Sequence, residues 1–103
     1  MKIKYLSVLA LVLLIAPAAQ ASEELAKKYN CLACHQADKK VIGPSYQEVA
    51  AKYKGQADAP ALLAKKVKEG GVGVWGQIPM PPNPTVPDTD MTALIAWIMG
   101  MAK

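Results

Sequence analysis

The 103-residue chain has no phenylalanine and no arginine, and it has only one histidine and two cysteines. Without arginine or interleaved basic and aromatic residues, it lacks the usual features of a nucleic-acid-binding surface. A structural zinc site needs four nitrogen or sulfur ligands, and the cysteines and histidine supply three. A small core without phenylalanine buries little apolar surface, so we expect the fold to need an additional apolar element.

The two cysteines and the histidine lie together in the segment Cys31-Leu32-Ala33-Cys34-His35. This C-x-x-C-H pattern is typical of the attachment site of a c-type haem. On a helical turn, positions i, i+3 and i+4 share one face, so both thiols can bond to haem vinyl groups while His35 binds the iron. A redox dithiol, a zinc site or a Cys31–Cys34 disulfide are the alternatives, and none of them requires the adjacent histidine. The motif therefore predicts one covalently bound haem c.

The first residues have the pattern of a targeting segment. Two lysines open the chain, and an apolar run from Tyr5 to Ala16 is shorter than the roughly 20 residues that span a bilayer. Ala19-Gln20-Ala21 matches an A-x-A cleavage site. We predict that residues 1–21 are a cleaved signal peptide directing export to the periplasm, with an uncleaved anchor as the alternative, and that residues 22–103 form one mature domain.

Four segments of the predicted mature chain carry helix signals. We predict helices over residues 22–35, 45–53, 58–70 and 88–101. Ser22 and Asp58 are the expected N-caps of the first and third helices, and Ser45 with Glu48 forms a capping box for the second. The proline-rich segment between residues 70 and 87 excludes a helix or a central strand there. The pattern predicts an all-α domain.

A second axial iron ligand would have to be a residue other than histidine. Methionine is the usual second ligand in electron-transfer haems of this type. The predicted mature chain offers Met80, Met91, Met99 and Met101. The last three lie on the final predicted helix, where methionine usually fills the core. Met80 lies in Ile78-Pro79-Met80-Pro81-Pro82-Asn83, where prolines fix the backbone, and it is the predicted ligand.

The segments CLACH, VIGPSY and GVWGQIPMPPN, followed by a helix with Trp97 near its centre, resemble the small bacterial class I cytochromes c of the c-551 (c8) type. The resemblance covers essentially the whole predicted mature chain. It implies a small all-α cytochrome c fold with about four short helices around one haem c, and Trp97 is expected to pack in the core. It also implies that Cys31 and Cys34 form the thioether bonds, that His35 is the proximal ligand and that Met80 is the distal one.

The resemblance assigns further residues to the surroundings of the haem. The carbonyl of Pro44 would accept a hydrogen bond from Nδ1 of the proximal ligand, and the indole N–H of Trp75 would bind a haem propionate. Asn83 would approach the sulfur of the distal ligand. Lys66 stands where this family often has arginine, so it is a candidate for a propionate contact made by a flexible point charge.

The resemblance implies a monomeric periplasmic one-electron carrier rather than an enzyme. If His35 and Met80 fill both axial positions, no position is open for a substrate. The partners it implies are transient: a quinol-oxidising membrane complex as donor, and a nitrite reductase, a cytochrome c peroxidase or a terminal oxidase as acceptor. The alternatives are a haem enzyme or gas-binding domain in which Met80 is displaced, and a structural haem subunit of a larger complex.

Overall fold

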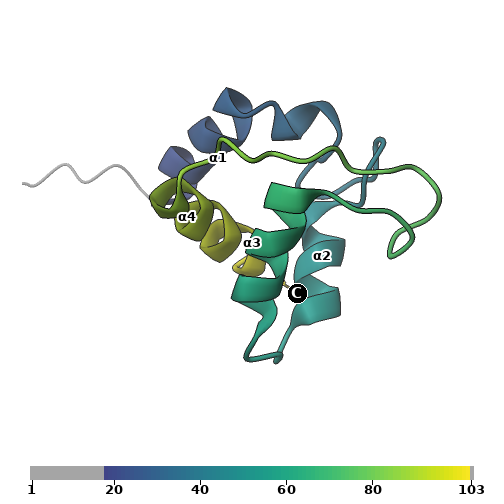
Figure 1. The fold of residues 1–103 in the computed structure, drawn as a ribbon. Helices are drawn as coiled ribbons and strands as arrows, with labels where there is room; N and C mark the ends of the chain where they lie inside the picture. The colour runs from purple at the N-terminus through teal and green to yellow at the C-terminus, as the bar shows by residue number, and fades with distance from the viewer. Residues whose placement is uncertain (1–17, 103) are drawn as a thin grey trace, which may run out of the picture.

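The computed structural model describes residues 18–102, and all regular elements in this range are helical (Figure 1). They are α1 (Ala18–Lys28), the short 3-10 helix η1 (Cys31–Ala33), α2 (Tyr46–Tyr53), α3 (Ala59–Glu69) and α4 (Asp88–Met99). The prediction of an all-α domain is confirmed. Most of the predicted signal peptide lies outside the described residues. No helix within residues 18–102 combines the length and apolar character needed to cross a bilayer.

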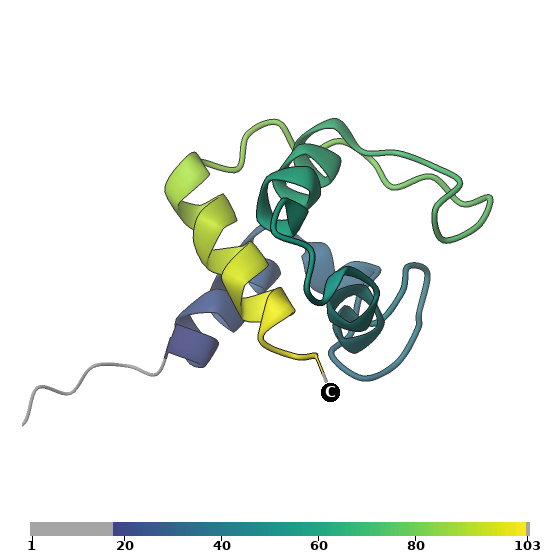
Figure 2. The same ribbon diagram turned by 90° about the horizontal axis from the view of Figure 1, so that it is seen from below.

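Helix α4 is the centre of the core and contacts α1, α2 and α3. Its buried residues recur at the spacing of one helical face, and they are Met91, Leu94, Ile95 and Ile98. Helix α1 crosses α4, as Figures 1 and 2 show together, and Ala26 is fully buried on α1. An alanine at such a position lets two helices approach closely. Trp97 is half-buried against the same core, as expected.

The first helix is shorter at its C-terminal end than predicted. Helix α1 ends at Lys28, whereas the prediction extended it to His35. Asn30 interrupts the helix because it adopts a left-handed conformation with φ of 60°, which asparagine tolerates better than most residues. The chain then forms η1. The haem motif therefore begins a separate turn after α1.

The prediction of Ser22 as an N-cap is wrong in this structure. Helix α1 starts at Ala18, so Ser22 lies inside it. Its buried hydroxyl donates a hydrogen bond of 3.3 Å to the carbonyl oxygen of Ala93 on α4. A serine on the inner face of a helix can satisfy its hydroxyl in this way, so the residue links two helices instead of starting one.

The second and third helices begin where the sequence predicted. The Ser45 Oγ atom accepts the backbone N–H of Glu48 at 3.1 Å and lies 3.2 Å from the Glu48 carboxylate, to which its hydroxyl donates. Asp58 precedes α3, but its side chain makes no capping hydrogen bond, and Pro60 in the first turn favours the helical start. Helix α3 stops at Gly70, whose φ of 72° suits glycine.

Two polar contacts hold the start of α4. The Tyr29 hydroxyl donates to Asp90 Oδ2 at 2.6 Å, which ties the end of α1 to α4. An ion pair between Lys68 and Asp88 joins the last turn of α3 to the first turn of α4. The hydrogen bond from Lys68 lowers the pKa of Asp88, so the contribution of this pair to stability is lost as the pH falls through that lowered value.

We predict that Ser45→Ala lowers the free energy of unfolding of the haem-loaded protein by about 1 kcal/mol, because it removes an N-cap acceptor. Chemical denaturation followed by circular dichroism measures the change. Thr89→Ala is the control, since Thr89 is exposed in the first turn of α4 and should change stability by less than about 0.5 kcal/mol. Equal effects of the two substitutions would contradict the assigned role of Ser45.

Candidate haem site

The C-x-x-C-H residues are gathered by one tight turn. The backbone N–H groups of Cys34 and His35 both donate to the carbonyl oxygen of Cys31, at 3.2 and 3.0 Å. Both cysteine thiols are free, and both residues are half-buried. The turn follows α1 and does not continue it, yet it still brings the first, fourth and fifth positions of the motif together. Two thiols and an imidazole are therefore available on one short segment.

The His35 ring is held by two neighbours from the segment that leads into α2. Its Nδ1 atom lies 2.7 Å from the carbonyl oxygen of the buried residue Pro44, so Nδ1 carries the proton and donates it. The ring also stacks on Tyr46, with centroids 5.2 Å apart and planes 18° apart. The hydrogen bond that the resemblance implied is present. It leaves the lone pair of Nε2 free to bind a metal.

Tyr46 is a site residue that the sequence analysis did not identify. Its ring meets the Trp97 ring edge-on, with the ring centroids 5.4 Å apart. A row of three aromatic rings, His35, Tyr46 and Trp97, therefore connects the site to α4. The available signal was its position as the first residue of α2, directly after the capping Ser45.

Burial shifts the pKa of two groups in the site. It raises the pKa of the Cys31 thiol, and it raises the pKa of the Tyr46 hydroxyl, with the nearby Cys31 adding to the effect. Reactive cysteines of redox dithiol motifs have a lowered pKa instead. The surroundings of Cys31 therefore do not favour the redox-dithiol alternative.

Met80 lies on a long irregular segment that is tied back on itself and to α3. The N–H of Gly71 donates to the Met80 carbonyl at 3.1 Å, and the N–H of Met80 donates to the Gly71 carbonyl at 2.8 Å. The side-chain amide of Asn83 donates to the carbonyls of Val67 and Pro81, at 3.3 and 3.1 Å. The predicted approach of Asn83 to the Met80 sulfur stays a prediction, and in this structure the amide anchors the loop.

The large apolar side chains that are exposed in the described residues gather on two loops. They are Val41, Ile42, Val72, Val74, Trp75 and Ile78. The first two follow His35 in the chain, and the others precede Met80. Apolar side chains concentrated in this way mark a binding surface. Together with two thiols, an imidazole and a thioether, they fit the macrocycle and the iron of a haem c.

Trp75 and Lys66, the residues predicted to contact haem propionates, lie on or beside the loop that carries Met80. Trp75 is 39% exposed, and the Lys52 ammonium lies 5.6 Å from the centre of its indole ring. Lys66, in the last turn of α3, is half-buried, and its Nζ atom would be 3.7 Å from a Cβ atom placed at Gly71. Both side chains are near the loop that carries Met80, and their contacts to a propionate stay predictions.

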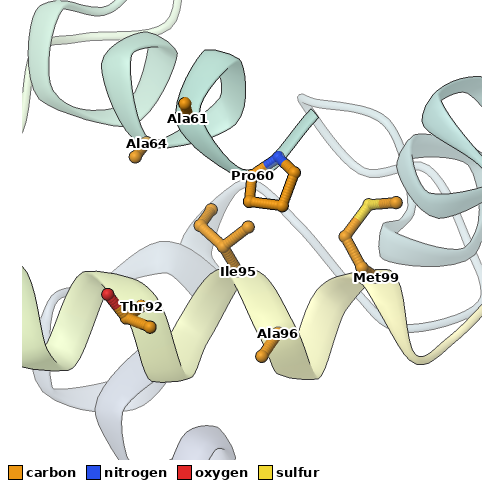
Figure 3. A pocket seen from close by; sticks show the side chains of 7 residues that line it. All are labelled: Pro60, Ala61, Ala64, Thr92, Ile95, Ala96 and Met99. Atoms are coloured by element: carbon orange, nitrogen blue, oxygen red, sulfur yellow. The ribbon is translucent and has the colours of Figure 1, made fainter. Parts of the chain in front are cut away.

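A groove of about 400 Å³ lies elsewhere, between α3 and α4 (Figure 3). Its lining residues are Pro60, Ala61, Ala64, Thr92, Ile95, Ala96 and Met99. It contains no residue of the haem motif and no titratable side chain. Within residues 18–102, no three histidine, cysteine, aspartate or glutamate side chains cluster as metal ligands. The groove is thus lined by apolar side chains and one threonine, and none of the haem-motif residues borders it.

Comparison with known proteins identifies the family. The cytochrome c family model matches residues 19–102. Cytochrome c-552 of Nitrosomonas europaea is 55% identical over 89 residues, which cover 86% of each chain. Cytochrome c-551 of Pseudomonas aeruginosa is 49% identical over 97 residues, which cover 92% of each chain. The crystal structure of the Nitrosomonas europaea cytochrome superimposes with a TM-score of 0.74, covering 77% of this chain and 98% of that one, at 54% identity.

These findings confirm four predictions from the sequence. The recognised family and the small all-α cytochrome c fold are correct. Proteins of this family carry one covalently bound haem c, and Cys31 and Cys34 fit its attachment motif. They are electron carriers and not enzymes. The chain belongs to the cytochrome c family.

Proposed function

We propose that the protein is a monomeric, periplasmic one-electron carrier whose haem iron is bound by His35 and Met80. The observation that supports this most directly is the hydrogen bond from His35 Nδ1 to the Pro44 carbonyl at 2.7 Å. It fixes the ring tautomer so that Nε2 presents a lone pair, directly after the two attachment thiols. Met80 is the candidate for the other axial position, and two backbone hydrogen bonds with Gly71 hold its loop in place.

Haem c, when bound, supplies an Fe(III)/Fe(II) couple that gains and loses one electron. The residues of the chain determine how that couple behaves. His35 and Met80 would occupy both axial positions and leave none for a substrate or a gas. The neutral thioether and the apolar side chains of the two loops favour the reduced state, which raises the potential. Cys31 and Cys34 would hold the group covalently, so that it cannot dissociate.

Backbone hydrogen bonds also hold the loop after His35. The N–H groups of Ile42 and Gly43 both donate to the Cys34 carbonyl, at 3.3 and 2.8 Å. The N–H of Tyr46 donates to the Gln36 carbonyl at 2.9 Å. Segments braced in this way would hold both ligands in place in either oxidation state. This supports rapid outer-sphere electron transfer, which requires little rearrangement.

Export is the second part of the proposal. Cleavage after Ala21 would remove the first turn of α1, which starts at Ala18. Ser22 would then be the N-terminal residue, and its hydrogen bond to Ala93 would anchor the new terminus to α4. The hydrogen bond of Ser22 and the buried Ala26 both lie after the cleavage site, so the predicted cleavage keeps these contacts of α1.

Partners should dock transiently at the surface formed by the two loops, with an interface below about 1,200 Å². Suitable partners are a quinol-oxidising membrane complex as donor and a nitrite reductase, a peroxidase or a terminal oxidase as acceptor. Lys39 and Lys40 are exposed, and the backbone of Lys40 pairs with that of His35, so the segment that carries both lysines lies beside the site. They would guide an acidic surface to it.

We predict that Met80→Ala abolishes the absorption band near the long-wavelength edge of the ferric spectrum, which is diagnostic of an iron–methionine bond. The reduction potential should fall by an amount on the order of 0.1 V, because axial ligands set haem potentials over a span of about 0.8 V. Absorption spectra and a redox titration of the purified exported protein measure both quantities.

Met99→Ala is the control for this experiment, since it removes a half-buried thioether from α4 and should leave band and potential in place. If Met80→Ala has the wild-type spectrum and potential, Met80 is not the ligand. A wild-type protein that lacks the band and binds exogenous ligands directly would favour the alternative of a haem enzyme or gas-binding domain.

We predict that electron transfer to an acidic redox partner slows as ionic strength rises from about 0.01 M to about 0.1 M, because the Debye length falls from about 30 Å to about 10 Å. Replacing Lys39 and Lys40 by glutamine should flatten this dependence. Lys27→Gln is the control, since Lys27 already pairs with Glu23 and Glu24 at 4.0 and 3.7 Å. Stopped-flow rates that do not respond to salt would contradict the proposed docking charges.

We predict that Lys66→Ala shifts the pH-dependent part of the reduction potential to higher pH. A nearby ammonium favours the ionised propionate, so its removal raises the propionate pKa. Redox titrations across pH measure the shift, and Lys65→Ala, an exposed neighbour on α3, is the control. Superimposable curves for Lys66→Ala and the wild type would show that Lys66 does not contact a propionate.

A further inference from the structure

We propose that Gly43 is a positioning residue for the axial imidazole: its missing side chain lets the His35 ring lie directly against the backbone and so sets the direction of Nε2. This inference rests on the proposed role of His35 as the iron ligand. Gly43 would act on the ring only through van der Waals contact.

The steric observation is specific to this glycine. A Cβ atom built at Gly43 would lie 2.6 Å from Cε1, 3.0 Å from Nδ1 and 3.2 Å from Nε2 of His35. Carbon atoms that are not bonded do not approach to 2.6 Å, since their attraction is optimal only at about 3.5–4.0 Å. Any residue other than glycine would therefore displace either the ring or the backbone.

The need for glycine at this position comes from the contact and not from backbone conformation. The φ angle of Gly43 is not positive. The glycines with positive φ are Gly55, Gly70, Gly73 and Gly76. Other residues could adopt its backbone angles without strain of that kind. The imidazole ring is thus the reason for the glycine.

Neither partner in this contact can move away easily. The backbone of Gly43 is held by its N–H, which donates to the Cys34 carbonyl at 2.8 Å, and by the buried Pro44 that follows it. The ring is held by Nδ1 on the Pro44 carbonyl at 2.7 Å and by stacking on Tyr46. An added methyl group would turn the imidazole about its side-chain bonds, weaken the Pro44 hydrogen bond and re-aim Nε2.

The chain offers a matched control. Gly71 also lacks a positive φ, and a Cβ atom built there would be no closer than 3.7 Å to any neighbour, at the Nζ atom of the flexible Lys66. It lies on the segment that pairs with Met80. Gly71→Ala therefore tests the general effect of a glycine-to-alanine change near the site without touching the imidazole.

The first experiment uses the wild-type, reduced, haem-loaded protein and needs no variant. We expect a strong nuclear Overhauser effect between a Gly43 Hα proton and His35 Hε1, because Cε1 is the ring atom nearest to the position of the missing side chain. Its absence would overturn the proposal, whatever the behaviour of substituted proteins.

The second experiment compares Gly43→Ala with Gly71→Ala in the oxidised haem-loaded protein. In a haem with one imidazole and one thioether ligand, the pattern of the hyperfine-shifted haem methyl resonances depends on the plane of the imidazole and on the orientation of the thioether. We expect Gly43→Ala to change the order of these resonances and Gly71→Ala to retain it. A folded Gly43→Ala protein with the wild-type order would overturn the proposal.

Two further outcomes are decisive. If Gly43→Ala yields no holoprotein while Gly71→Ala does, the added Cβ is not tolerated, and with the wild-type Overhauser effect this supports the proposal. If the wild-type resonances show that no imidazole binds the iron, the proposed function fails first. If they show an iron–imidazole bond that Gly43→Ala does not turn, only the role of Gly43 is lost.

Discussion

The orientation of one imidazole ring is the constraint on which the site depends, and three of the four residues from Gly43 to Tyr46 impose it. Gly43 leaves room for the His35 ring, Pro44 accepts the proton of Nδ1, and Tyr46 stacks on the ring. Ser45, between them, caps α2. The same short segment thus orients the ring and starts the helix that packs on α4. A shift of α2 would move the Pro44 carbonyl and the Tyr46 ring, so the packing of α2 on α4 also fixes the position of the His35 ring.

The composition of the chain explains why the stability of the helical core depends on the haem site. The helices approach closely at small residues, with Ala26, Ala50 and Ala59 fully buried, and no phenylalanine fills the interior. The largest exposed apolar side chains gather on the two loops around the haem motif. A covalently held macrocycle between these loops would contribute the apolar centre that the side chains do not provide. Its binding free energy adds to the stability of the folded state, because the unfolded chain cannot make those contacts.

The sequence predicted the features that depend on local chemistry. The C-x-x-C-H motif, the capping Ser45 and the glycine end of α3 each follow from residue types at fixed spacing. It did not predict the break at Asn30, because apolar periodicity continues across it and asparagine is allowed within a helix as well as outside one. The stacking of Tyr46 and the contact at Gly43 were also missed. Both arise when a loop folds back on the motif, and neither residue type alone signals such a contact.

The loop of Met80 shows how a segment without regular structure can be rigid. In residues 79–84, only Met80 and Asn83 have a backbone N–H, since the other four residues are prolines. Both N–H groups donate hydrogen bonds. That of Met80 donates to the Gly71 carbonyl at 2.8 Å, and that of Asn83 donates to the Val67 carbonyl at 2.9 Å. A loop with restricted φ angles loses little entropy on ordering. Opening it would break both bonds without forming new ones within the loop. Such a loop suits a thioether that stays bound during electron transfer better than one that is displaced by a substrate.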